Sequence, residues 1–297
     1  MAQILDLSGT WQLHGSGWTP GRTIPVRLPG DNYTALLENG LIPDPFYGKN
    51  EELIQEYRRH QWTFLREFRL TRDDLNFDSI YLNVEMLDTL ATLYLNDQEV
   101  IRTDNMFRRY RPEVKQFLIP GLNTIRIEIR PVEPEAETIA ASLEIDAPMV
   151  SCSHVPGMNL IRKPHCHGGW DWGLIMAESG VYLPLTLHGI NHSRIEYVHH
   201  IQHHEADRCS VEVCVELHAP HEGQEELTLE FNGETRRITA TLHPGENRIT
   251  AGFQVEHPRL WWPNGAGTQE LYPLTVTTSD EELRQEIGLR TLEVVNR

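Results

Sequence analysis

The sequence predicts an all-β protein built from two domains. Apolar residues alternate with polar ones over short runs that are rich in β-branched and aromatic side chains, which is the pattern of half-buried strands. Glycine, proline, asparagine or aspartate closes most of these runs, as expected for turns. The chain has 297 residues, a length that corresponds to two domains and supplies enough apolar material for two cores.

In the first part of the chain, the strand-like runs lie at residues 59–70, 79–86, 90–100, 123–131 and 182–190. Asn96-Asp97 is predicted to turn a hairpin, because small polar residues tolerate positive φ. Two short helices are expected between the strands. The stretch DNYTALLENG has Asp31 as its N-cap and Gly40 as its stop, and NEELIQEYRR has Asn50 ahead of two first-turn glutamates.

A domain boundary is predicted near residues 190–193, which divides the chain into domains at 1–191 and 192–297. Before it, residues 131–170 show little periodicity and are predicted to be a long irregular connection. After it, short strands recur at regular spacing, at residues 209–219, 226–233, 236–245 and 272–279. This spacing predicts an immunoglobulin-like sandwich, with a hairpin turn at Asn232-Gly233.

The chain is strongly acidic. Its 26 Lys plus Arg against 43 Asp plus Glu give a formal net charge of −17, which argues against nucleic acid or an anionic membrane surface as a partner, because a polyanion would be repelled. The start, MAQILDLSGTWQL, has no features of a signal peptide, and no apolar run is long enough to span a membrane. We therefore expect a cytoplasmic protein whose four cysteines are free thiols.

The stretch HGGWDWG, residues 167–173, is the main candidate for a binding site. An indole offers a flat surface to the C–H face of a sugar, and a carboxylate accepts hydrogen bonds from two adjacent hydroxyls. Trp170, Asp171 and Trp172 would therefore suit a neutral, hydroxyl-rich ligand. If the backbone is extended, Asp171 faces away from both indoles, whereas the glycines permit a tight course that presents all three together. The residues alone favour an alternative in which the tryptophans are core residues and Asp171 caps a turn or pairs with Arg162.

Histidines concentrate in two stretches that raise the question of a metal. In HHIQHH, His199 and His203 share a strand face and offer two imidazoles to zinc. No cysteine or carboxylate at fixed spacing completes that set, so a solvated strand is favoured. His165, Cys166 and His167 likewise lack a second pair of ligands. We therefore expect neither a metal nor another cofactor.

Catalytic motifs do not stand out in the sequence. Glycosidic hydrolysis needs two carboxyl groups about 5 to 9.5 Å apart in a cleft, and no pair of acidic residues is recognisable as such. No nucleophile elbow, phosphate loop or His-Glu-x-x-His motif is present. LWWPNGAG, residues 260–267, offers two indoles as a stacking platform, although a turn supported by aromatic residues at a domain interface is favoured.

Six segments follow one another along the whole chain: LSGTWQL, VRLPGDNYTALLENGLIPDPFYGKNE, LDTLATLYLNDQEVIRTDNMFRRYRPEV, IRKPHCHGGWDWG, LWWPNGAGTQELYPLTV and IGLRTLEV. Together they resemble the N-terminal part of β-mannosidases of glycoside hydrolase family 2. The resemblance implies a jelly-roll, galactose-binding-like sandwich for 1–191 and an immunoglobulin-like β-sandwich for 192–297. It also implies a retaining, exo-acting enzyme whose two catalytic glutamates lie in a (β/α) barrel that follows these domains, so this chain alone is expected to be inactive.

The resemblance also implies a role for HGGWDWG. In related enzymes a loop of the first domain completes the subsite for the terminal sugar. Asp171 is therefore expected to accept hydrogen bonds from the terminal mannose, beside Trp170 and Trp172. The implied partners are a mannose-terminated oligosaccharide and the barrel. Two alternatives stay open, namely a free-standing carbohydrate-binding module and the same portion of a family 2 β-galactosidase or β-glucuronidase.

Overall fold

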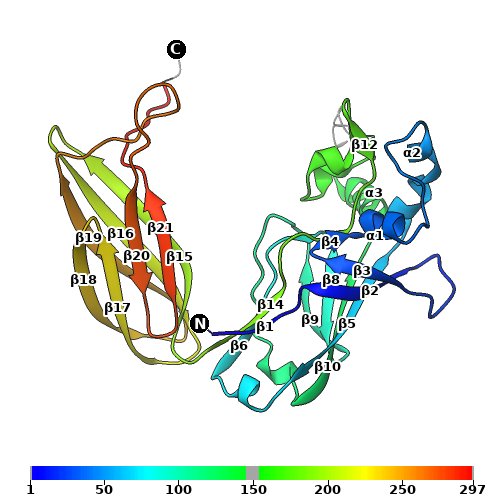
Figure 1. Cartoon of the computed structure of the whole chain (residues 1–297), viewed down its shortest axis with the longest axis horizontal. Helices are drawn as coiled ribbons and strands as arrows, with labels where there is room; N and C mark the ends of the chain where they lie inside the picture. The colour runs from blue at the N-terminus through cyan, green and yellow to red at the C-terminus, as the bar shows by residue number, and fades with distance from the viewer. Residues whose placement is uncertain (1, 145–153, 296–297) are drawn as a thin grey trace. The chain divides into compact units, whose positions relative to one another are not determined.

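The computed structural model describes residues 2–144 and 154–295, which fall into two compact units (Figure 1). The first unit contains Gln3–Asn76 and Ile80–His188, and the second contains Gly189–Arg297 together with Met1–Ala2 and Phe77–Ser79. The main division therefore lies close to the predicted domain boundary at residues 191 and 192. Strands dominate both units, which confirms the all-β prediction.

The first unit is built on a six-stranded antiparallel sheet in the order β3-β2-β5-β10-β8-β9. Its strands are β2 (Gly9–Gly15), β3 (Ile24–Leu28), β5 (Trp62–Leu70), β8 (Ala91–Leu95), β9 (Gln98–Thr103) and β10 (Gly121–Ile129). β5 and β10 pair along their full lengths, with Ile127 opposite Phe64. These two residues are fully buried, so the alternation in the sequence places one face of each strand in the core.

Shorter β elements accompany this sheet. They are β1 (Ala2–Asp6), β14 (Thr186–Ile190) and β6 (Ser79–Asn83) in one sheet, β4 (Gly30–Asp31), β13 (Gly180–Val181) and β7 (Leu87–Asp88) in another, and β11 (Gly168–Trp170) with β12 (Gly173–Ile175) in a hairpin. The predicted turn between β8 and β9 is confirmed, because Asn96 and Asp97 both have positive φ, at 50° and 63°. The fully buried Trp11 and Trp62 anchor the core of this unit.

The first predicted helix is present, whereas the second, over residues 50–59, divides into a short α-helix and a 3-10 turn. The α-helices are α1 (Asn32–Glu38), α2 (Asn50–Leu53) and α3 (Val132–Ser142), and the 3-10 turns are η1 (Gln55–Arg59), η2 (Asp73–Leu75), η3 (Lys115–Phe117), η4 (Met158–Leu160) and η5 (His165–His167). Asp31 caps α1 as predicted, since its carboxylate accepts from the backbone N–H of Thr34 at 2.9 Å. Asn50 does not cap α2: it is the first helical residue, and its side chain donates to the carbonyl of Asp44.

The prediction of an irregular connection over residues 131–170 is wrong where α3 forms. This helix starts directly after Pro131, and Pro134 falls in its first turn, where a missing backbone N–H has little cost. Its apolar stripe is narrow, because only Val132 and Ala136 are buried hydrophobics, and it packs into a small core with Val155, Met158 and Ile161. So little apolar surface gives a weak helical pattern in the sequence. Residues 145–153 of this stretch lie outside the described residues.

The second unit is a sandwich of two antiparallel sheets, β15-β16-β19 and β18-β17-β20-β21 (Figure 1). Its strands are β15 (Arg194–His204), β16 (Arg208–Ala219), β17 (Gly223–Phe231), β18 (Glu234–Leu242), β19 (Gly245–Glu256), β20 (Tyr272–Thr277) and β21 (Glu282–Ile287). Residues from both sheets share one core, where Phe231 packs edge-on against Phe253. The predicted turn at Asn232-Gly233 is confirmed by positive φ at both residues. This arrangement confirms the predicted immunoglobulin-like sandwich.

Three of the four cysteines lie within the described residues, and all three are free thiols, as predicted. Cys209 and Cys214 are buried in the second unit, whereas Cys166 is partly exposed in the first. Cys152 lies outside the described residues. Across residues 2–144 and 154–295, the helices are all too short or too polar to pass through a membrane.

Candidate functional site

The HGGWDWG stretch folds as a β-hairpin at one end of the first unit. β11 and β12 pair antiparallel with Trp170 opposite Gly173, so Asp171 and Trp172 form a two-residue turn at the tip. Figure 1 shows β12 at the same end of this unit as α2. Of the two backbone courses that the sequence left open, the structure has the tight one, because the chain reverses between the two tryptophans.

The tip of the hairpin is exposed. Trp172 is 76% exposed, Asp171 is exposed and Trp170 is half-buried. The ring centroids of the two indoles are 5.9 Å apart, and their planes are inclined by 40°. Asp171 makes no hydrogen bond or ion pair with a described residue. The alternative in which both tryptophans are core residues and Asp171 caps a turn or pairs with Arg162 is therefore wrong.

Gly169 determines the backbone course that leads into the tip. Its φ is +91°, a conformation that strongly favours glycine. A Cβ atom at this position would lie 2.7 Å from side-chain atoms of His154 and of Ile175. Gly173 is different, since its φ is not in the left-handed region and an added Cβ would meet its nearest atom, in Trp170, at 3.8 Å. The hairpin thus depends on one of its flanking glycines far more than on the other.

A buried charged cluster fixes the base of the hairpin. Nζ of Lys163 lies 3.0 Å from Oδ2 of Asp88, and both side chains are fully buried. The same ammonium group donates to the backbone carbonyl of Glu178 at 2.6 Å. Nδ1 of His167, the residue before β11, lies 3.2 Å from Asp88 Oδ2 and 3.2 Å from Glu178 Oε2. The cluster therefore joins both ends of the hairpin to β7.

The imidazole of His167 is shared between two acids. An N–H group at Nδ1 of His167 can donate to only one of the two acids, and here it donates to Oδ2 of Asp88. Oε2 of Glu178 is left buried without a hydrogen bond. Burial raises the pKa of Glu178 above its usual value, and the charges of His167 and Lys163 offset this only in part. Burial likewise raises the pKa of Tyr182, whose ring centroid lies 6.2 Å from that of His167.

Helical segments support the outer strand of the hairpin. The backbone N–H of Ile175 donates to Oε1 of Glu51 in α2 at 2.6 Å, and its carbonyl accepts from Nε2 of Gln55 in η1 at 3.0 Å. An unsupported edge strand would leave these groups for solvent or another chain. η1 is attached in turn to α3, because Nε of Arg58 lies 3.0 Å from the buried carboxylate of Glu133. The exposed tip therefore stands on a well-connected base.

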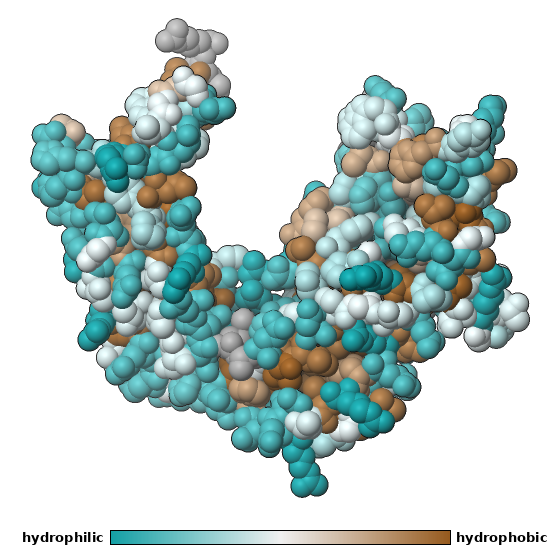
Figure 2. All heavy atoms as spheres, in the orientation of Figure 1, coloured by the Kyte–Doolittle hydropathy of each residue, from teal (hydrophilic) through white to brown (hydrophobic). Residues whose placement is uncertain are grey.

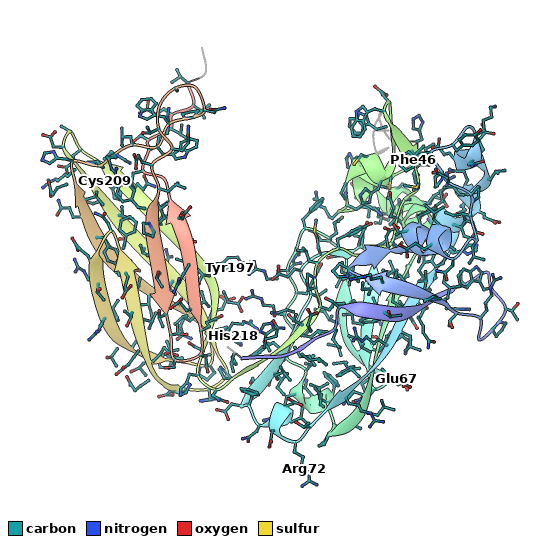
Figure 3. All side chains as sticks on the ribbon, in the orientation of Figure 1. Phe46, Glu67, Arg72, Tyr197, Cys209 and His218 are labelled. Carbon is teal, nitrogen blue, oxygen red and sulfur yellow. The ribbon has the colours of Figure 1, made fainter. Side chains whose placement is uncertain are left out.

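A small pocket of about 110 Å³ lies beside the residues that follow β12. Tyr33 and Glu178 supply its buried polar groups, and the hydroxyl of Tyr33 has no hydrogen-bond partner there. Phe46, which is 78% exposed and labelled in Figure 3, also lines it. Tyr47 and Trp172 are exposed to a similar extent. Figure 2 shows apolar and weakly polar residues gathered over this end of the first unit, as expected of a surface that binds a ligand or another domain.

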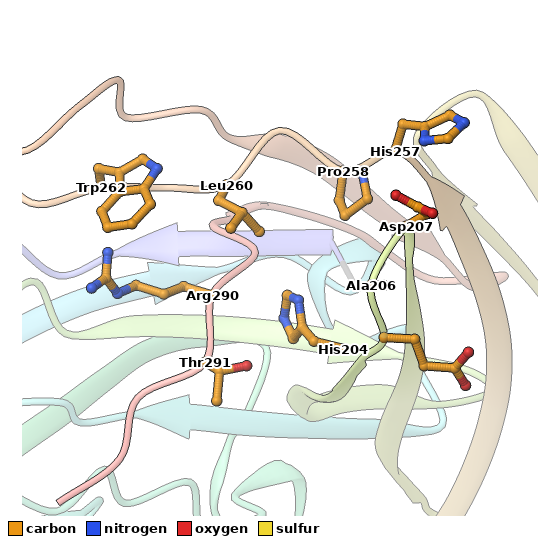
Figure 4. Close-up of a pocket in the computed structure, with 10 residues that line it drawn as sticks. His204, Ala206, Asp207, His257, Pro258, Leu260, Trp262, Arg290 and Thr291 are labelled. Atoms are coloured by element: carbon orange, nitrogen blue, oxygen red, sulfur yellow. The ribbon is translucent and has the colours of Figure 1, made fainter.

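The LWWPNGAG stretch lies in the second unit, where it borders a groove of about 450 Å³ (Figure 4). The guanidinium of Arg290 lies 4.6 Å from the ring centroid of Trp262. Arg290 therefore occupies a face of the indole on which a sugar would stack. His204 and Asp207 also line the groove. We assign no sugar-binding role to it.

Sequence reasoning found the tip of the hairpin but missed the groups that hold it. Asp88 lies 79 positions from His167, and Glu51 lies 124 positions from Ile175, so no local pattern joins them. The one hint was the concentration of Lys163 and His167 in an otherwise acidic chain. Within the described part of the chain, His165, Cys166 and His167 do not converge into a set of metal ligands.

Two known families match consecutive parts of the chain. Residues 11–183 match the glycosyl hydrolase 2 galactose-binding domain-like family, and residues 193–290 match glycosyl hydrolases family 2. The first match contains the hairpin and the groups that support it.

Individual proteins are similar along nearly the whole chain. β-Mannosidase B of Thermothelomyces thermophilus is 30% identical over 320 residues, which cover 99% of this chain and 35% of that protein. β-Mannosidase B of Emericella nidulans is 28% identical, with 98% of this chain and 36% of that protein covered. The crystal structure of a β-D-mannosidase from Dictyoglomus thermophilum matches with a TM-score of 0.90 and 26% identity over 97% of this chain and 36% of that chain. The chain thus spans little more than a third of each relative.

Proposed function

Because the chain belongs to glycosyl hydrolase family 2, we propose that it forms the N-terminal, non-catalytic part of a retaining β-mannosidase. The complete enzyme would remove terminal β-D-mannose residues from oligosaccharides. The similarity of this chain to β-mannosidases over nearly all of its length supports that activity over β-galactosidase or β-glucuronidase.

The observation that carries the proposal is the exposed carboxylate of Asp171 between two indoles. A carboxylate that has no partner among the described residues can offer its hydrogen-bonding capacity to hydroxyl groups. Trp170 and Trp172 offer apolar faces to the C–H groups of the same ring. The three side chains together suit one neutral sugar, and we propose that they bind the terminal mannose.

A binding group outside the catalytic domain contributes to the reaction through the transition state. Hydrolysis distorts the sugar ring toward an oxocarbenium-like geometry, and hydrogen bonds to its hydroxyls that strengthen on distortion lower the barrier. Asp171 would act in this way, while the acid/base and the nucleophile would be two glutamates of a (β/α) barrel. In this proposal the hairpin is the part of the first unit that meets the barrel.

The net charge of −17 disfavours nucleic acid and anionic membranes as partners and, more weakly, an anionic glucuronide as substrate. A cytoplasmic location stays a prediction from the sequence alone.

Two measurements on the purified 297-residue chain test the proposal. The first is hydrolysis of 4-nitrophenyl β-D-mannoside, and the second is calorimetric titration with mannose and mannobiose. We expect no turnover, because the catalytic glutamates are outside this chain, and no saturable binding, because Asp171 and the tryptophans form only part of a subsite.

The outcomes separate the alternatives. Turnover that stays with the chain through purification would contradict the non-catalytic role. Saturable binding of mannobiose without turnover would favour a free-standing carbohydrate-binding module instead. Restoration of mannosidase activity when the chain is joined to the barrel, with little activity on galactosides or glucuronides, would support the proposal.

A further inference from the structure

Cys214 of the second unit occupies an unusual position. Along β16 the residues that enter the core of the sandwich are Cys209, Val211, Val213, Val215, Leu217 and Ala219. Cys214 falls between them in the alternation and therefore points to the outer face of the sheet. It is nevertheless only 1% exposed. Side chains on the outer face must therefore cover its thiol.

The register of the sheet identifies two of these neighbours. His199 of β15 stands directly opposite Cys214, and Glu216 follows two residues later on the same face of β16. The ligand atoms of the three side chains all lie within 4.8 Å of one another. In a tetrahedral zinc site with bonds of about 2.0 to 2.3 Å, the ligand atoms are about 3.3 to 3.8 Å apart. The spacing in the structure therefore exceeds that of a tetrahedral site by at most about 1.5 Å.

The charges around the thiol also suit a divalent cation. Arg248 of β19 stands opposite Glu216, and its Nε lies 2.7 Å from Sγ of Cys214. The carboxylates of Glu212 and Glu216 lie on the same face of β16 as Cys214, and their two negative charges exceed the single positive charge of Arg248. An N–H donor on a coordinating sulfur is a common outer partner of metal thiolates.

We propose that His199, Cys214 and Glu216 form a zinc site on the outer face of the β15-β16-β19 sheet, with the fourth position open to water. An imidazole, a thiolate and a carboxylate are all zinc ligands, and the thiolate disfavours magnesium and calcium. Binding deprotonates the thiol: the Sγ–Zn bond replaces the S–H bond, and the proton is released to solvent. The proposal goes beyond the mannosidase function and is independent of it.

This site departs from the expectation that the chain binds no metal. The sequence suggested His199 and His203 as a pair, but the ligands that complete the set come from the neighbouring strand. His203 is opposite Ser210, which is a poor zinc ligand. The bound ion would join β15 to β16 and stabilise the second unit by mass action, about 2.7 kcal/mol when free zinc is 100 times its dissociation constant.

Cobalt(II) tests the proposal, because a cobalt–thiolate bond gives a near-ultraviolet charge-transfer band. The chain is freed of metal with a chelator, titrated with Co²⁺ and then with Zn²⁺. We expect one Co²⁺ per chain, a charge-transfer band, and loss of the band as Zn²⁺ displaces Co²⁺. The band should disappear in Cys214→Ala, and affinity should fall by about tenfold or more in His199→Ala and Glu216→Gln.

Two matched variants keep the test specific. His203→Ala removes an imidazole from the same strand face and should leave affinity within about twofold, as expected for a residue that does not touch the metal. Cys166→Ala removes the partly exposed thiol of the first unit and should leave the band intact. The absence of a band, its persistence in Cys214→Ala, or its loss in Cys166→Ala would overturn the proposal. If circular dichroism shows that Cys214→Ala is unfolded, unchanged affinity in His199→Ala would overturn it equally.

Discussion

Lys163 is predicted to be the residue on which the base of the hairpin depends most. Its ammonium group is fully buried, 3.0 Å from the fully buried carboxylate of Asp88. Substitution Lys163→Met keeps the length of the side chain and removes the charge. The carboxylate of Asp88 then stays in the interior without its cation, and the carbonyl of Glu178 loses its donor.

The magnitude follows from the burial of both partners. Removal of one member of a buried ion pair costs about 3 to 5 kcal/mol, because the remaining charge is desolvated without compensation. For a domain of this size, each kcal/mol lowers Tm by about 2 to 4 °C, so the first unit should melt roughly 6 to 20 °C earlier. The double variant Lys163→Met, Asp88→Leu should recover much of the loss, since it leaves no buried charge.

Differential scanning calorimetry measures this effect, because it resolves the unfolding of the two units when they melt separately. The matched control is Lys49→Met, which breaks the ion pair between Lys49 and Glu52, whose side chains are 85% and 70% exposed. We expect the control to cost less than about 1 kcal/mol. If Lys163→Met were no more damaging than Lys49→Met, the assignment of Lys163 as the anchor of the hairpin would be refuted.

Two further variants test the surroundings of the tip. Burial raises the pKa of Glu178 above 4.5, so the wild type loses stability as the pH rises from that value to the raised pKa. Glu178→Gln cannot ionise and should therefore gain stability relative to the wild type as the pH rises above 4.5. A difference in stability that is independent of pH in denaturant titrations would contradict the assignment. Gly169→Ala places a side chain at a residue with positive φ and in contact with His154 and Ile175, so it should lower the free energy of unfolding by about 1 to 3 kcal/mol. The control Gly173→Ala should change the free energy of unfolding by less than about 1 kcal/mol. Equal effects of the two substitutions in thermal unfolding would show that Gly169 has no special role.

Local features of the fold were predictable from the sequence because their causes are local. The turns at Asn96-Asp97 and Asn232-Gly233 need residues that accept positive φ, and the cap at Asp31 needs an oxygen three residues before an N–H group. α3 was missed because its apolar stripe is narrow and Pro134 lies in its first turn. A helix that is stabilised mainly by its surroundings leaves little trace in its own sequence.

In the candidate site, too, the features with local causes were predictable and those that depend on distant residues were not. The composition of the WDW stretch was enough to suggest a sugar-binding group, and the structure places Asp171 at an exposed turn. The sequence permitted a tight course but could not decide between it and an extended strand, since the reversal depends on the φ of Gly169 and on Ile175 being held by Glu51. The zinc proposal likewise depends on strand register, which alone brings His199 and Cys214 together.

The most direct test of the account compares kcat/KM for a β-mannoside between the complete enzyme and its Asp171→Ala variant. Loss of charged hydrogen bonds to the sugar should raise the barrier by about 2 to 4 kcal/mol, a decrease of roughly 30- to 1,000-fold in kcat/KM. Tm should not change, because Asp171 is exposed and has no partner among the described residues. Asp73 is another exposed residue of the first unit whose side chain has no partner in the described part of the chain, so Asp73→Ala should leave both quantities unchanged. An Asp171→Ala enzyme with kcat/KM within about threefold of the wild type would contradict the claim that this hairpin binds the terminal sugar.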